Sequence, residues 1–196
     1  MKNNIKYYLA AYNLTAFIFW LAYLFVFAAS GFRLSDTGLL LLNVAQGMAI
    51  FEIVHAILKW VKSPVMSTAA QVFSRVLVVV LINVFYQNPL SSITQNGIIV
   101  VSIAWGITEL VRYSFYFLGL LDIQPKWLLW MRYTFFIVLY PVGVFGEWLI
   151  FLFVLIPKGP GLNLNTGFVA VLLVAYVLYF PKLYRYMWKQ RRLKLG

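Results

Sequence analysis

Residues 137–151 read IVLYPVGVFGEWLIF. The stretch is apolar enough for a membrane-spanning helix, yet it contains Pro141, two glycines and Glu147. Proline and glycine weaken a helix, and a carboxylate in hydrocarbon is energetically costly. The stretch lies inside a longer apolar run, residues 127–156. We therefore interpret it as part of a transmembrane helix whose unusual residues face the interior of a helix bundle.

The whole chain has the composition of a membrane protein. Of its 196 residues, 63% are hydrophobic and 11% are charged, with a mean hydropathy of +0.86. A soluble domain would be about half apolar and about a quarter charged. The apolar runs are separated by the turn-forming segments SGFRLSD, KSP, QNPLSS, LLDIQPK and PKGPGLN. The sequence therefore predicts an all-α polytopic protein with one domain over residues 1–196 and six spans, at about 7–30, 37–60, 66–87, 97–119, 127–156 and 165–187.

The lysines and arginines predict the orientation. With the N-terminus in the cytosol, twelve of them lie on the cytosolic side and only Arg33 and Lys158 lie on the other. The positive-inside rule then places both termini in the cytosol, and the run from Lys6 to Ala29 is an uncleaved first span. The net charge of +11 fits this topology and anionic lipid, so we expect membrane lipids as partners and no nucleic acid. No cysteine is present, which excludes thiolate metal sites and cysteine nucleophiles.

Five charged residues fall inside the expected spans: Glu52, Arg75, Glu109, Arg112 and Glu147. Each costs about 2.5 kcal/mol or more at the membrane centre unless it is paired or hydrated. Glu109 and Arg112 are i, i+3 neighbours that can pair, either as a structural ion pair or as a cation positioned to contact a thioester or phosphate. Arg75 needs a partner from another helix, and we expect Glu52 or Glu109.

Two further patterns accompany these charges. Helical spacing puts one polar stripe on the span at 97–119, made by Ser102, Gly106, Glu109, Tyr113 and Tyr116. In the second span, Glu52 and His55 are i, i+3 neighbours. One histidine and one glutamate are too few for a metal site, so we interpret them as a structural hydrogen bond.

The fifth span carries the sharpest pattern. One helical face presents Tyr133, Phe136, Tyr140, Gly143 and Glu147. Tyr140 and Glu147 are two turns apart, and Gly143 between them leaves a slot. Pro141 is expected to kink the helix there, because it lacks a donor and crowds the carbonyl of residue 137. A phenol and a carboxyl in an apolar site can do acid–base work. Spacing alone is equally compatible with a kinked packing helix and a bundle-facing glutamate.

Segments in separate spans carry a family resemblance, and they follow one another in order: FEIVHA at 51–56, QVFSRV at 71–76, AWGITELVRYSFY at 104–116, RYTFFIVLYPVGVFGE at 132–147 and FPKLYRYMWKQRR at 180–192. Over nearly its whole length the chain resembles the very-long-chain (3R)-3-hydroxyacyl-CoA dehydratases, also called protein tyrosine phosphatase-like proteins. The loop after the fifth span is short for that family. The phosphatase name misleads here, because a chain without cysteine forms no phosphocysteine intermediate.

The resemblance implies a hydro-lyase of fatty-acid elongation. It implies a multi-pass protein of the endoplasmic reticulum membrane that removes water from a (3R)-3-hydroxyacyl-CoA to give a trans-2-enoyl-CoA, without metal or cofactor. Its catalytic pair corresponds to Tyr140 and Glu147. We expect supporting or substrate-binding roles for Arg75, Glu109, Arg112, Tyr116, Tyr133 and Gly143. The expected partners are the other elongation enzymes: the condensing enzyme, the ketoacyl reductase and the enoyl reductase.

The roles within the pair stay open. Glu147 as base and Tyr140 as acid is the first hypothesis, and the reverse assignment is nearly as good. The basic side chains of Lys59, Lys62, Lys126 and Arg132 would meet the CoA phosphates, or they are plain topology charges. Two other classes also account for buried charges: a transporter or channel with an intramembrane Glu/Arg relay, and a catalytically silent scaffold of the elongation complex.

Overall fold

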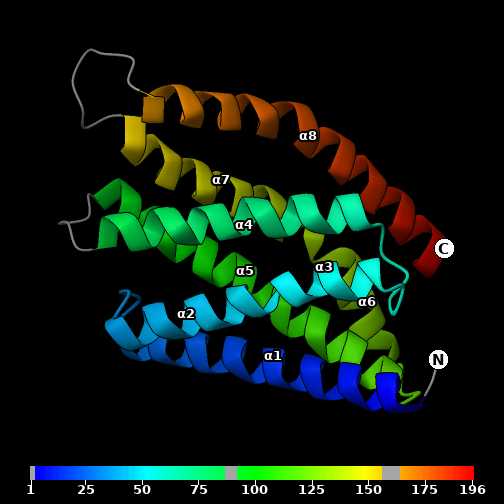
Figure 1. Cartoon of the computed structure of the whole chain (residues 1–196). Helices are drawn as coiled ribbons and strands as arrows, with labels where there is room; N and C mark the ends of the chain where they lie inside the picture. Colours follow the sequence, from blue (N-terminus) through cyan, green and yellow to red (C-terminus); the bar gives the residue numbers. More distant parts are fainter. Residues whose placement is uncertain (1–2, 87–91, 156–163) are drawn as a thin grey trace. The chain divides into compact units, whose positions relative to one another are not determined.

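The computed structural model describes residues 3–86, 92–155 and 164–196. Within these ranges the chain forms helices joined by short turns, and no strand occurs (Figure 1). The helices are α1 (Asn3–Ala29), α2 (Asp36–Met48), α3 (Ile50–Ile57), α4 (Val65–Tyr86), α5 (Ser92–Leu120), α6 (Lys126–Thr134), α7 (Phe136–Leu155) and α8 (Leu164–Leu195).

The helices confirm an all-α membrane architecture. In the described residues, five helical stretches are long and apolar enough to cross a membrane, and a sixth results when α6 and α7 count as one span. One of the five, Asp36–Ile57, comprises α2 and α3. The six-span prediction is therefore confirmed. The breaks expected at 87–91 and at 157–163 lie outside the described residues.

Three helices end with the same backbone turn. Gly31, Lys59 and Asp122 have φ angles of 65°, 56° and 62°, which is the left-handed region. In each case the next residue donates its N–H to the carbonyl five residues back: Phe32 to Phe27, Trp60 to His55, and Ile123 to Leu118. These are Schellman-type ends, which satisfy carbonyls that the helix leaves without partners. Two of these ends, at Gly31 and Asp122, lie in the turn-forming segments SGFRLSD and LLDIQPK, whereas the end at Lys59 comes before the segment KSP.

The fifth span is broken, but not where its proline stands. The segments Lys126–Thr134 and Phe136–Leu152 meet at 41°, whereas α7 continues through Pro141. The kink expected at Pro141 thus lies six residues earlier, at Phe135. Pro141 still deprives the carbonyl of Ile137 of its helical donor. The hydroxyl of Tyr184 donates to this carbonyl at 3.2 Å, which replaces the missing bond and lets the helix continue.

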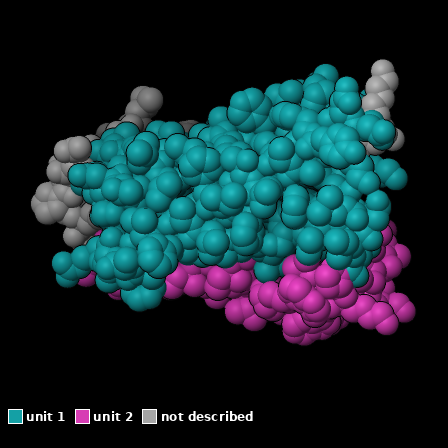
Figure 2. All heavy atoms as spheres, turned by 90° about the horizontal axis from the view of Figure 1, so that it is seen from below, with its two compact units in different colours: residues 1–89, 109–124 teal, residues 90–108, 125–196 magenta. Residues whose placement is uncertain are grey.

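The chain divides into two compact units, drawn in teal and magenta in Figure 2. Unit 1 comprises residues 1–89 and 109–124, and unit 2 comprises residues 90–108 and 125–196. Helix α5 contributes residues to both. The expectation of a single domain stays a prediction.

Unit 1 is a bundle with α1 against α2 and α3 against α4; α1 and α2 run side by side in Figure 1. Its core includes Trp20, Tyr23 and Phe27, all at most 1% exposed. Asn43 of α2 and Asn83 of α4 exchange two amide hydrogen bonds of 2.9 and 2.7 Å. Such paired amides tie helices together in hydrocarbon, where unpaired polar groups are costly.

Unit 2 depends on close approach between α5 and α7. A Cβ atom at Gly97 would lie 2.9 Å from the carbonyl oxygen of Gly146. Gly97 also faces residues 149 and 150, whereas Gly143 faces residues 104 and 105, so the two helices run antiparallel. Helix α8 packs against both α6 and α7. The small residues therefore bring α5 close enough for its side chains to reach Glu147.

We expect Gly146→Ala to destabilise unit 2 by about 1–3 kcal/mol, because overpacking a close contact forces the helices apart. The added Cβ would lie 2.8 Å from γ-methyls of Val100 and Val101 and 3.0 Å from the backbone nitrogen of Val101. Gly143→Ala is the matched control, since its Cβ meets no atom closer than 3.7 Å. Equilibrium unfolding in detergent measures both variants. Equal stability of the two variants would contradict the close contact of α5 and α7 at Gly146.

Candidate active site

Tyr140 and Glu147 both lie on α7, within unit 2. Seven residues of helix separate them, which is a rise of about 10.5 Å. Glu147 is buried, with 7% of its surface exposed. Tyr140 is half-buried and its ring contacts Phe136 edge-on, with centroids 6.4 Å apart. Among the described residues, the Tyr140 hydroxyl has no hydrogen-bond partner. The helix thus presents one half-buried phenol and one buried carboxyl.

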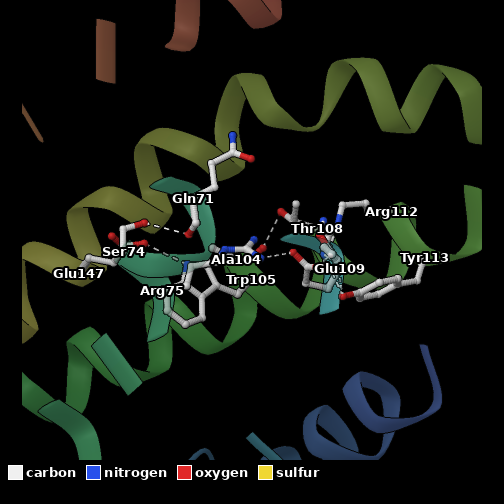
Figure 3. Close-up of polar contacts among 11 residues, drawn as sticks. Gln71, Ser74, Arg75, Ala104, Trp105, Thr108, Glu109, Arg112, Tyr113 and Glu147 are labelled. Carbon is white, nitrogen blue, oxygen red and sulfur yellow. Dashed lines mark hydrogen bonds and ion pairs between the residues drawn. The ribbon is translucent and has the colours of Figure 1, made fainter. Parts of the chain in front are cut away.

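The carboxyl of Glu147 receives hydrogen bonds on both oxygens. The indole Nε1–H of Trp105 on α5 donates to Oε1 at 3.1 Å, as Figure 3 shows. The hydroxyl of Tyr176 on α8 donates to Oε2 at 2.5 Å. Sequence reasoning identified neither donor. Trp105 stands in the quoted motif at 104–116, but Tyr176 is one tyrosine among thirteen, and no spacing relates it to Glu147.

Gly143 lies on the buried side of α7, facing α5. A Cβ there would be 3.7 Å from the Cβ of Ala104 and 3.8 Å from Cδ1 of Trp105. These are ordinary contact distances. The slot expected beside Gly143 is therefore no wider than a methyl group in this direction, and the indole of Trp105 borders it.

Two other residues expected to support the pair belong to other segments of the chain. Tyr133 stands near the end of α6, before the break at Phe135, so it does not continue the face of α7. Tyr116 belongs to unit 1, is 41% exposed and has its ring 5.9 Å from that of Phe115. Ser102 and Tyr113 of the expected stripe are buried. The exposed Tyr116 shows that the stripe is not uniformly interior.

Unit 1 contains a charge cluster, formed by Glu52, Arg75, Glu109, Arg112 and Tyr113. Figure 3 labels the last four of these residues. Glu109 is completely buried and forms ion pairs with Arg75 at 2.5 Å and with Arg112 at 2.6 Å. Both the i, i+3 pair and the expected partner of Arg75 are therefore confirmed.

The same cluster includes Glu52. Arg112 donates to its two carboxylate oxygens at 2.6 Å each, and the hydroxyl of Tyr113 donates to it at 2.7 Å. This forked geometry is the strongest arginine–carboxylate arrangement. Two carboxylates and two guanidiniums balance in charge, which favours a structural ion-pair network over a cation held ready for substrate.

The hydrogen bond expected between Glu52 and His55 is not present among the described residues. Arg112 and Tyr113 already occupy the carboxylate of Glu52. His55 instead shares a 3.0 Å hydrogen bond with the Tyr8 hydroxyl, and its ring stacks on Trp60 with centroids 5.8 Å apart. Over residues 3–86, 92–155 and 164–196, no group of three or more histidine, aspartate or glutamate side chains is arranged to hold a metal ion.

The fold and the site together define a class: a multi-span helical membrane protein with a tyrosine and a buried glutamate on one span. Residues 46–196 match the family described as "Protein tyrosine phosphatase-like protein, PTPLA". The chain belongs to this family.

Curated relatives bear a more specific name. The chain is 39% identical to "Very-long-chain (3R)-3-hydroxyacyl-CoA dehydratase hpo-8" of Caenorhabditis elegans, covering 98% of this chain and 96% of the relative. It is 32% identical to "Very-long-chain (3R)-3-hydroxyacyl-CoA dehydratase PASTICCINO 2" of Arabidopsis thaliana, over 97% and 94%. It is 36% identical to the dehydratase 1 of Canis lupus familiaris, over 77% of this chain and 65% of the relative. No solved structure matches the chain.

Proposed function

We propose that the protein is a very-long-chain (3R)-3-hydroxyacyl-CoA dehydratase, a hydro-lyase that converts its substrate to a trans-2-enoyl-CoA. The names of the curated relatives support this reading. The observation in the chain that carries it is the pair on α7, in which a buried Glu147 lies two turns from Tyr140. Dehydration needs these two kinds of group: a base for the C2 proton and an acid for the leaving C3 hydroxyl.

The reaction tests the proposal directly. Protein purified in detergent is given 3-hydroxyacyl-CoAs of several chain lengths, and enoyl-CoA is quantified by chromatography. The reverse assay supplies trans-2-enoyl-CoA and measures hydration. We expect turnover in both directions without added metal or cofactor. A folded protein that turns over no chain length in either direction would exclude this function.

We further propose that the protein is a multi-pass protein of the endoplasmic reticulum membrane with both termini cytosolic, working with the condensing enzyme, the ketoacyl reductase and the enoyl reductase. The support is the bias of lysine and arginine toward one side of the expected spans. Glycosylation acceptor sites introduced into individual loops test the orientation, because only lumenal sites become glycosylated.

The phosphates of the CoA moiety, which the pantetheine arm separates from the thioester, need cations where they bind. The C-terminal part of α8 has a hollow of about 650 Å³ lined by Arg185, Trp188, Lys189 and Arg192. Within the described part of the chain, none of these three cations forms an ion pair. The Trp188 ring lies 5.8 Å from that of Phe136, which in turn contacts Tyr140. This basic face of α8 is therefore a better candidate for the phosphates than the four cations expected from the sequence.

We expect the triple change Arg185→Gln, Lys189→Gln and Arg192→Gln to raise KM for the CoA substrate by about tenfold or more, because the loss of even one charge-assisted bond corresponds to about that factor. The KM for the N-acetylcysteamine thioester, which lacks the nucleotide, is expected to stay unchanged. Lys182→Gln with Lys194→Gln is the matched control, since neither residue lines the hollow. An equal rise for both thioesters would show that the basic face does not bind phosphate.

A further inference from the structure

Three helices converge on the carboxyl of Glu147. It projects from α7, Trp105 reaches its Oε1 from α5, and Tyr176 reaches its Oε2 from α8. All three residues belong to unit 2. The two donors thus hold the carboxyl from different sides, and neither lies on the helix that carries the carboxyl.

The chemistry of the donors favours one charge state of the acceptor. An indole N–H only donates, so Oε1 of Glu147 accepts from Trp105. The hydroxyl of Tyr176 donates to Oε2 at 2.5 Å. Hydrogen bonds donated to both oxygens favour the ionised form of a carboxyl group over the neutral form.

We infer that Trp105 and Tyr176 are positioning residues that hold Glu147 as an ionised carboxylate and so make it the base of the reaction. The inference rests on the proposed dehydratase function and adds the direction of proton transfer to it. An ionised carboxylate takes up a proton, whereas a neutral carboxylic acid gives one up.

Packing fixes both donors. The ring of Tyr176 meets that of Phe151 edge-on, with centroids 5.9 Å apart, and Phe151 is completely buried. The indole of Trp105 is 5% exposed, and its Cδ1 lies 3.8 Å from where a Cβ at Gly143 would stand, so it packs against this part of α7.

The assignment leaves Tyr140 as the acid. Its hydroxyl has no hydrogen-bond partner among the described residues, so its proton is available to a leaving group. Glu147 takes the C2 proton, the C2–H electron pair becomes the C2=C3 bond, and the C3–O bond breaks. The departing oxygen takes the proton of Tyr140 and leaves as water. Proton exchange through water then moves the proton on Glu147 back to the Tyr140 phenolate, which completes the cycle.

Tyr176→Phe tests the inference kinetically. We expect kcat to fall about 10- to 100-fold with KM unchanged, because one bond to a charged group is lost. With substrate deuterated at C2, we expect a larger isotope effect on kcat, since removal of that proton becomes slower. A purely structural role would not change the isotope effect. Tyr179→Phe is the matched control, because Tyr179 stands on the same helix and is 47% exposed.

An infrared measurement tests the charge state without turnover. The chain has only five acidic side chains, so the difference spectrum between the wild type and Glu147→Gln isolates one carboxyl. We expect a carboxylate band in the wild type and the carbonyl band of a neutral acid in Tyr176→Phe. If Tyr176→Phe does not fold, Trp105→Phe takes its place in both experiments.

The outcomes separate the two proposals. A folded wild type without dehydratase activity removes the proposed function. The positioning role alone is removed if Tyr176→Phe has unchanged kcat and isotope effect, while the wild type is active and Glu147→Gln is inactive. A neutral-acid band for Glu147 in the wild type also overturns the inference.

Discussion

Replacing Glu147 with glutamine is expected to lower kcat for dehydration by about 10²- to 10⁴-fold, the usual contribution of a general base. Glutamine keeps the shape of the side chain, and its carbonyl oxygen still accepts a hydrogen bond from Trp105. The amide does not accept the C2 proton at neutral pH. The KM is expected to change little, because the substrate contacts are otherwise retained. Chromatography of the enoyl-CoA product measures the effect.

Tyr140→Phe is the companion variant and is expected to lose activity to a similar extent. It removes only a hydroxyl that has no hydrogen-bond partner among the described residues, so stability should stay close to that of the wild type. Tyr179→Phe controls for loss of a phenol elsewhere on the protein. If folded Tyr140→Phe and Glu147→Gln both retain normal activity, the pair on α7 is not the catalytic site.

The same variants discriminate between the three classes of function. A transporter with an intramembrane relay would show proton-coupled flux in liposomes and no hydration of enoyl-CoA by the purified protein. A silent scaffold would keep its associations with the other elongation enzymes and show no turnover with either residue present. Turnover that disappears with Glu147→Gln fits neither alternative.

The sequence predicts the spans and the pair because both follow from local rules. A run of about 20 apolar residues in lipid forms a helix, since only internal hydrogen bonds satisfy its backbone. Seven residues of helix place Tyr140 and Glu147 on one face whatever surrounds them. The partner of Arg75 was also predictable, because a buried cation needs an anion and Glu109 is one of only three glutamates in the chain.

The contacts to Glu147 were not predictable, because they depend on how helices distant in sequence pack. Trp105 reaches the carboxyl where Gly97 and Gly146 bring α5 against α7. A tyrosine inside an apolar run, such as Tyr176, is equally compatible with a lipid-facing or a buried position. The straight course of α7 at Pro141 was not predictable for the same reason, because Tyr184 of α8 satisfies the carbonyl that Pro141 leaves open. The bend lies at Phe135.

Glu109→Leu is expected to destabilise the protein by about 3–5 kcal/mol, the range for removing one partner from a buried ion pair. Glu109 is completely buried. It forms an ion pair with Arg75, and it shares the guanidinium of Arg112 with Glu52. Its loss leaves the charge cluster with one carboxylate for two guanidiniums. Equilibrium unfolding in detergent, followed by tryptophan fluorescence, measures the change.

Two variants decide whether charge balance is the cause. Glu109→Leu with Arg75→Met restores one carboxylate to one guanidinium, so the double variant is expected to be more stable than Glu109→Leu alone. Asp122→Asn removes an exposed ion pair, in which the side chain of Asp122 is 84% exposed and that of Lys6 is 37% exposed. This change is expected to lower the free energy of unfolding by at most about 1 kcal/mol. If Glu109→Leu is as stable as Asp122→Asn yet loses activity, the cluster is not a structural network. Its arginines would then act on substrate, which is the alternative that the sequence left open.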